Sequence, residues 1–258
     1  MLLFFSTLQS KIFKLSGIIW CMSDPKVTLV QFVERLNSAN LHNQLTRNAV
    51  MYALEDYPLP RNNGYNFYEG HVFPVTLHVM DYFQQFNIPL RQEVVAASLL
   101  HDALEDTLID DKRFIKKFGQ EVYQLVKPLT RPEIWELNVR QGDDIGGIKK
   151  EVYYAQLRSA PLESKVIKLA DRYNNMSSLN FRGDARESRV SSYIQEAEEF
   201  YLEFARSVDM QIGSGTYWHD LFRRKTEELK WQTQPLYKRA KRRILSLFQR
   251  NRIIKQKP

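Results

Sequence analysis

The sequence predicts an all-α protein. Apolar residues recur every three to four positions through most of the 258 residues, which is the spacing of one face of a helix. No stretch alternates between apolar and polar residues for the length of a strand with turns at both ends. A hydrophobic content of 43% and a charged content of 26% are ordinary for a globular protein of this length, which can bury one large core, alone or with a smaller appendage.

The N-terminal half is expected to hold helices separated by breaks rich in Pro, Gly and Asn. Residues 28–54 fit two helices with a break near residues 38–40, because Val, Leu and Phe recur at helical spacing on both sides of it. Residues 56–68 (DYPLPRNNGYNFY) form a loop, since two prolines and an Asn-Gly pair punctuate them. Further helices are expected over about 70–86, from about 91 through the stretch 99–107, and over 110–126.

The C-terminal half follows the same pattern. Pro128 and Pro132 bracket a turn, and residues 138–147 (NVRQGDDIGG) form a polar loop. A Gly-Ser-Gly break is expected at 213–215. Helices are expected at about 148–159, 161–179, 186–210, 217–231 and 236–254.

Residues 1–27 are expected to be an N-terminal extension, either amphipathic or disordered. Residues 1–21 are apolar, but two lysines interrupt them before a run long enough to span a membrane is reached. The charges lie inside the apolar stretch, unlike those of a secretory leader, and Met22 looks like a more natural start. The single cysteine, Cys21, excludes an intramolecular disulfide and favours a cytoplasmic location.

The positive charge of the chain is concentrated at its C-terminal end. Residues 223–258 hold 13 Lys or Arg against 2 Asp or Glu, whereas the preceding residues hold 24 against 28. Residues 236–254 therefore read as a basic amphipathic helix. It could pack on the core with a solvated basic face, bind an anionic lipid or nucleic acid surface, or raise the local concentration of a polyanionic nucleotide.

The stretch 99–107 (LLHDALEDT) contains the densest group of chemically useful side chains. In one continuous helix, two i,i+4 pairs would lie along one edge: His101 with Glu105, and Asp102 with Asp106. A solvated acidic face gives the same pattern. Here, however, an apolar run precedes the pair His101-Asp102, so both begin near the core and need partners. His and Asp are common ligands of divalent metals, and the next turn offers two carboxylates for acid–base chemistry.

Candidate partners lie on both sides of this stretch. His71 opens the helix at 70–86, and His78 follows on nearly the same face and competes for the same role. Downstream, Asp171 lies within an apolar helical segment, KVIKLADRYNN. A carboxylate in that position needs a cation, which is either a metal ion or an arginine such as Arg172.

Together, these features resemble the HD-superfamily metal phosphohydrolases. The strings LLHDALEDT and KVIKLADRYNNMSSL are similar to the hydrolase domain of the RelA/SpoT homologues, the alarmone hydrolases, and the resemblance covers about residues 65–181. It implies an HD-domain helical bundle over 28–181, followed by a C-terminal helical extension over 182–258. It also implies a manganese-dependent enzyme that removes the 3′-pyrophosphate from guanosine tetra- or pentaphosphate.

The resemblance also implies roles for individual residues. The metal ligands would be His71, His101, Asp102 and Asp171, and the catalytic acidic pair would be Glu105 and Asp106. The nucleotide would be contacted by Asn175, Ser178, which replaces the usual threonine, and Arg61. Two imidazoles and two carboxylates suit Mn²⁺ or a similar divalent ion, which lowers the pKa of bound water and polarises a phosphoryl oxygen. The acidic pair would orient that water or protonate the departing oxygen.

Two departures from the family pattern leave alternatives open. The gap from His71 to His101 is longer than usual; His78 would shorten it, but lacks the following valine that His71 has in Val75, so His71 is favoured. The Arg-Lys pair that usually precedes the first histidine is missing, and Arg61 is the one basic residue in that loop.

The sequence therefore leaves the substrate open. Alternatives are a hydrolase of another phosphorylated nucleotide, or an inactive nucleotide-binding regulatory protein. The presence of all six His and acidic motif residues favours activity. No segment after residue 181 resembles a synthetase domain, and the sequence leaves open whether the chain forms oligomers.

Overall fold

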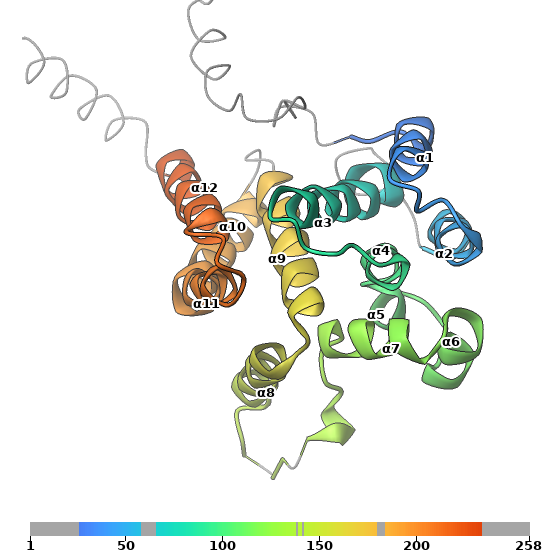
Figure 1. The fold of residues 1–258 in the computed structure, drawn as a ribbon. Coiled ribbons are helices and arrows are strands. Elements are labelled where there is room, and N and C mark those ends of the chain that lie inside the picture. Colours follow the sequence, from blue (N-terminus) through green and yellow to red (C-terminus); the bar gives the residue numbers. More distant parts are fainter. Residues whose placement is uncertain (1–25, 58–65, 138, 141, 180–183, 234–258) are drawn as a thin grey trace, which may run out of the picture.

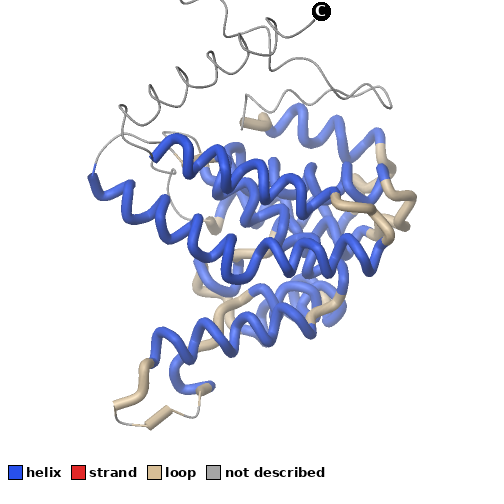
Figure 2. The backbone as a smooth tube through the Cα atoms, turned by 90° about the vertical axis from the view of Figure 1, so that its left-hand side faces the viewer, coloured by secondary structure: helices blue, strands red, loops and turns tan. Residues whose placement is uncertain are grey.

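The computed structural model describes residues 26–57, 66–137, 139–140, 142–179 and 184–233, and all regular structure in these ranges is helical (Figures 1 and 2). The predicted all-α class is confirmed. Arg61, residues 1–25 and the expected helix at 236–254 lie outside the described ranges. The elements are α1 (Leu29–Ser38), α2 (Gln44–Glu55), η1 (Tyr68–Val72), α3 (Phe73–Gln85), α4 (Gln92–Leu99), α5 (Ala103–Asp106), α6 (Asp111–Phe118), α7 (Gln120–Val126), η2 (Lys127–Leu129), η3 (Ile134–Glu136), α8 (Ile145–Ser159), α9 (Leu162–Ser177), α10 (Asp184–Glu196), η4 (Ala197–Tyr201), α11 (Leu202–Ile212) and α12 (Tyr217–Thr233).

Helix α9 is the central element of the fold (Figure 1). It packs against α3, α7 and α8, and also against α11 and α12. Because neighbours surround it, nearly every residue from Ser164 to Tyr173 is buried. A helix buried on all sides is usually apolar, yet α9 buries Lys168, Asp171 and Arg172. Buried charges of this kind need partners, and the partners define the site described below.

The helix expected from residue 91 through the stretch 99–107 is not continuous, so that prediction was wrong. Helix α4 ends at Leu99, and α5 begins at Ala103. In a continuous helix the Ser98 carbonyl would accept the N–H of residue 102. Here Nδ1 of His101 lies 2.8 Å from that carbonyl, and the N–H of Ala103 bonds the Leu100 carbonyl instead. The histidine itself thus helps to end α4.

The expected single helix over 110–126 is also divided. Gly119 has a φ of 93° and separates α6 from α7. Glycine has no side chain, so it adopts this positive φ at little steric cost. Gly119 therefore allows the chain to turn between α6 and α7.

The helix expected over 70–86 begins earlier and with a different winding. Its first turn, η1, is π-helical, and the N–H of Phe73 bonds the carbonyl of Tyr68, five residues earlier. Pro74 follows within the first turn of α3 and has no N–H to donate, which removes one α-helical bond at this junction. A second π-helical turn, η4, lies between α10 and α11 in the helix expected over 186–210. Among the described helices, none is long and apolar enough to cross a membrane.

Candidate metal centre

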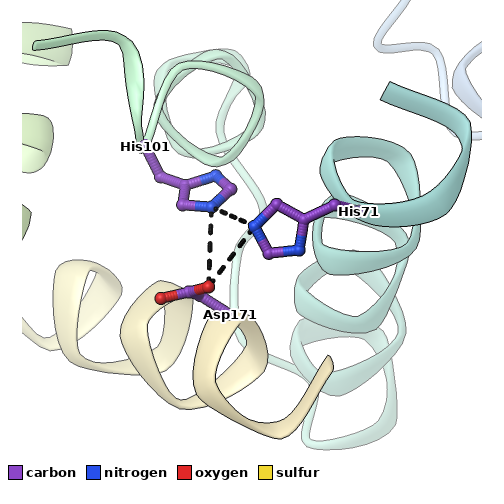
Figure 3. Close-up of side chains that lie close together, drawn as sticks. All are labelled: His71, His101 and Asp171. Carbon is purple, nitrogen blue, oxygen red and sulfur yellow. Dashed lines mark hydrogen bonds and ion pairs between the residues drawn. The ribbon is translucent and has the colours of Figure 1, made fainter. Parts of the chain in front are cut away.

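Three buried side chains from distant parts of the chain converge beside α9 (Figure 3). His71 comes from η1, His101 from the turn after α4, and Asp171 from α9, and each is at most 3% exposed. The two Nε2 atoms are 3.1 Å apart. Oδ1 of Asp171 lies 3.4 Å from Nε2 of His71 and 3.8 Å from Nε2 of His101. These three residues form a group that could hold a metal ion.

Asp102 lies beside these three residues. Its Oδ2 lies 3.3 Å from Nε2 of His71 and 3.2 Å from Nε2 of His101. Ligand atoms bound about 2.1 Å from one ion lie about 3.0–3.5 Å from their neighbours in octahedral or tetrahedral geometry. Most of the observed separations match that spacing.

The outward-facing nitrogens of both imidazoles indicate which ring nitrogen is free to bind a metal. Nδ1 of His101 lies 2.8 Å from the Ser98 carbonyl, and Nδ1 of His71 lies 2.7 Å from Oδ1 of Asn174. Both oxygens are acceptors, so each Nδ1 donates a proton outward and each Nε2 is the nitrogen that faces the centre. The two Nε2 atoms and the neighbouring carboxylates would repel one another if both rings were neutral, so positive charge among them, as a proton or a metal ion, stabilises the arrangement.

The electrostatics of the site lead to the same conclusion. Burial by itself lowers the pKa of His101, but the carboxylates of Asp102 and Asp171 outweigh it and raise that pKa to about 9. Without a metal ion, His101 is therefore protonated at neutral pH beside two ionised carboxylates. A divalent ion in place of that proton supplies positive charge and leaves both imidazoles neutral, so the residues present fit a metal ion.

The acidic pair Glu105 and Asp106 lies on α5, the short helix that follows the candidate ligands His101 and Asp102. The main-chain N–H of Arg131 donates to Oε1 of Glu105 at 2.5 Å, which anchors that carboxylate to the segment after η2. Partial burial and the carboxylates of Asp102 and Glu105 raise the pKa of Asp106 to about 6. The two carboxylates, which the sequence presents as equivalent, therefore differ in the structure: Glu105 accepts a main-chain hydrogen bond, and Asp106 has a raised pKa.

Asp171 is paired with Lys168, a residue that the sequence reading missed, and not with Arg172. Nζ of Lys168 lies 2.8 Å from Oδ2 of Asp171. Arg172 instead pairs with Glu196, and its guanidinium lies over the ring of Tyr193. The i,i+3 spacing of Lys168 and Asp171 on a buried helix could have indicated the pair. Each oxygen of Asp171 therefore has its own role, with Oδ1 turned toward the imidazoles.

Two of the three residues expected to contact the nucleotide, Asn175 and Ser178, lie at the C-terminal end of α9. Nδ2 of Asn175 donates to Oδ1 of Asp171 at 2.5 Å, and Oγ of Ser178 donates to the carbonyl of Asn175 at 3.1 Å. Asn175 is therefore next to the candidate ligands, and a contact with substrate stays a prediction. So does the role of Arg61, which lies outside the described residues.

His78, the alternative first ligand, points into a different part of the core. Its ring stacks on Trp218 with centroids 4.8 Å apart, and Nε2 lies 3.2 Å from the hydroxyl of Tyr217. Burial lowers the pKa of His78 to about 4. His78 thus projects from α3 onto α12 as a neutral ring and does not join the group that contains His71.

Comparison with known proteins places this arrangement in a family. Residues 68–210, more than half of the chain, match the model of the family described as HD domain. The chain belongs to the HD domain family. The match includes His71, His101, Asp102 and Asp171.

Among curated proteins, GTP pyrophosphokinase rsh of Brucella ovis is 25% identical over 231 residues, covering 89% of this chain and 28% of its own length. The guanosine-3′,5′-bis(diphosphate) 3′-pyrophosphohydrolase of Borreliella burgdorferi is 26% identical over 163 residues, covering 60% of this chain and 23% of its own length. The chain therefore spans less than a third of these relatives. A solved structure of a metazoan ortholog of SpoT covers 72% of this chain at 18% identity, with a TM-score of 0.47.

Proposed function

We propose that this HD domain protein is a metal-dependent phosphohydrolase that removes pyrophosphate from the 3′ position of guanosine 3′,5′-bis(diphosphate). The observation that supports the proposal is the convergence of His71, His101 and Asp171, with Asp102 beside them. The carboxylates of Glu105 and Asp106 lie on the helix that follows Asp102. The name of the Borreliella burgdorferi relative supports this choice of substrate.

We infer that His71, His101, Asp102 and Asp171 hold the ion, and that Mn²⁺ is the preferred one. Two imidazoles and two carboxylates form a mixed ligand set suited to Mn²⁺, and a site of four protein ligands leaves positions open for water and phosphate. When bound, the ion supplies an activated water and polarises the phosphoryl oxygen.

The chain's own residues divide the remaining work. Asp106, whose pKa is raised to about 6, can exchange a proton near neutral pH, so we assign it the proton of the attacking water. Glu105 is held by the main-chain N–H of Arg131 and serves to orient the reacting groups. Asn175 and Ser178, at the end of α9, are proposed to position the nucleotide, together with Arg61.

A panel of phosphorylated nucleotides tests this proposal. The purified chain with Mn²⁺ should release pyrophosphate from guanosine 3′,5′-bis(diphosphate) and much less product from GTP, GDP or adenine nucleotides. Faster release from another nucleotide would favour the alternative HD hydrolase that the missing Arg-Lys pair leaves open. If the chain binds Mn²⁺ yet releases neither phosphate nor pyrophosphate from any nucleotide, both enzyme assignments are wrong and a regulatory nucleotide-binding role is favoured.

A further inference from the structure

The two candidate histidine ligands are oriented by different kinds of groups. Nδ1 of His101 donates a hydrogen bond to the main-chain carbonyl of Ser98, which a substitution does not remove. Nδ1 of His71 donates a hydrogen bond to a side chain, Oδ1 of Asn174, at 2.7 Å. The outer hydrogen bond of His71 can therefore be changed by a substitution at Asn174.

The outer partner of a metal-binding histidine decides which nitrogen is available. An acceptor at Nδ1 keeps the proton there, leaves the lone pair on Nε2 and fixes the plane of the ring. We propose that Asn174 is a positioning residue that holds His71 in its metal-binding tautomer and orientation, an inference that rests on the proposed metal site.

The geometry of α9 explains how one helix achieves this. Asp171 and Asn174 are three residues apart and so lie on neighbouring positions of one helix face. The first turns Oδ1 toward Nε2 of His71 at 3.4 Å, while the second meets Nδ1 of the same ring at 2.7 Å. Helix α9 thus contacts both nitrogens of a histidine that is 103 residues away from Asn174 in sequence. The nearly full burial of His71 leaves little room for another orientation.

Two substitutions test whether the Asn174 amide accepts a hydrogen bond from Nδ1 of His71 or donates one to it. Asn174→Asp keeps the shape of the side chain and can only accept from His71 when ionised, and Asn174→Leu removes the acceptor. Mn²⁺ affinity is read directly from the electron paramagnetic resonance signal of the free ion. Asn174→Asp should bind Mn²⁺ at least as tightly as the wild type, whereas Asn174→Leu should bind about 10- to 100-fold more weakly.

Two controls exclude general effects of charge and stability. Ser177→Asp adds a carboxylate at an exposed position of α9, and Met176→Ala removes a buried apolar side chain from the same helix. Both should leave Mn²⁺ affinity nearly unchanged. The Asn174→Asp variant carries the test alone if Asn174→Leu does not fold.

The inference is overturned if Asn174→Leu binds Mn²⁺ as tightly as the wild type. It is also overturned if Asn174→Asp loses affinity, because the amide would then be donating to Nδ1. A wild-type chain that binds Mn²⁺ but hydrolyses no nucleotide contradicts the proposed function and leaves the role of Asn174 intact. A wild-type chain that binds no Mn²⁺ overturns both.

Discussion

Of the six buried His, Lys, Arg and Asp side chains in the described residues, four lie at the candidate metal centre. His71, His101, Lys168 and Asp171 are each at most 9% exposed, and they contact one another either directly or through one intervening side chain. Leaving a buried charge without its partner costs far more than the pair contributes as a whole. Replacing a residue that pairs with one of the candidate ligands should therefore destabilise the protein.

Replacing Lys168 tests how much its pairing with Asp171 contributes to the stability of the protein. In metal-free protein, Lys168→Met leaves Asp171 buried without its 2.8 Å partner, so the free energy of unfolding should fall by about 3 kcal/mol. Urea unfolding in the presence of a chelator measures the change. Lys127→Met is the matched control, because Lys127 is 40% exposed and pairs with Asp111 at the surface. Equal losses in the two variants would contradict the assignment of Lys168 to a buried pair.

The pH dependence of turnover tests the role of Asp106. As a base it must be deprotonated, so kcat/KM should rise as pH rises through the pKa of Asp106. Burial, Asp102 and Glu105 raise that pKa to about 6 in the metal-free protein, and bound Mn²⁺ lowers it, so at saturating Mn²⁺ the midpoint of the rise should lie below about pH 6. Asp106→Asn should remove the rise and lower kcat by about 10²-fold or more while Mn²⁺ still binds. An unchanged profile would assign the proton to another group.

At the scale of elements, both candidate histidine ligands lie where helices begin or end. His71 lies in the π-helical turn η1, and His101 lies in the turn between α4 and α5. Helical spacing predicted most of the helices, because helix formation depends on short stretches of sequence, and the family resemblance implied the candidate ligands. It did not predict the break after Leu99, since that break depends on one side chain bonding the Ser98 carbonyl. Nor did it predict Asn174, whose role depends on a partner 103 residues away.

The start of α12 also depends on a partner outside that helix, the buried carboxylate of Asp209. This carboxylate is 1% exposed and accepts from the main-chain N–H groups of Trp218 and His219 and from Oγ of Ser214. Asp209→Ala leaves those groups without their acceptor, so the free energy of unfolding should fall by about 2 kcal/mol, as urea titration can measure. Glu203→Ala removes an exposed carboxylate from α11 and should change little. Equal effects would mean that Asp209 does not fix α12.

At the scale of the whole molecule, the site joins elements that are far apart in the chain. A metal ion there would link η1, the turn after α4, and α9, around which the fold is packed. The proposed division at residue 181 and the binding of an anionic surface by residues 236–254 stay predictions, as does self-association.

Metal binding should therefore stabilise the entire described fold. An ion at 100 times its Kd adds about 2.7 kcal/mol, which corresponds to a rise of about 5–10 °C in Tm for a chain of this size. Thermal unfolding with Mn²⁺ and with EDTA measures the difference. Asp171→Asn should abolish it, and a rise of equal size in that variant would place the bound ion elsewhere.

The most direct test of the proposed chemistry is pyrophosphate release from guanosine 3′,5′-bis(diphosphate) across a Mn²⁺ titration. Wild-type chain and Asp171→Asn are compared, with folding of both checked by circular dichroism. We predict release that rises and saturates with Mn²⁺ in the wild type and is lost in Asp171→Asn. Release that needs no divalent ion, or that persists in folded Asp171→Asn, would contradict a metal-dependent hydrolase built on these four ligands.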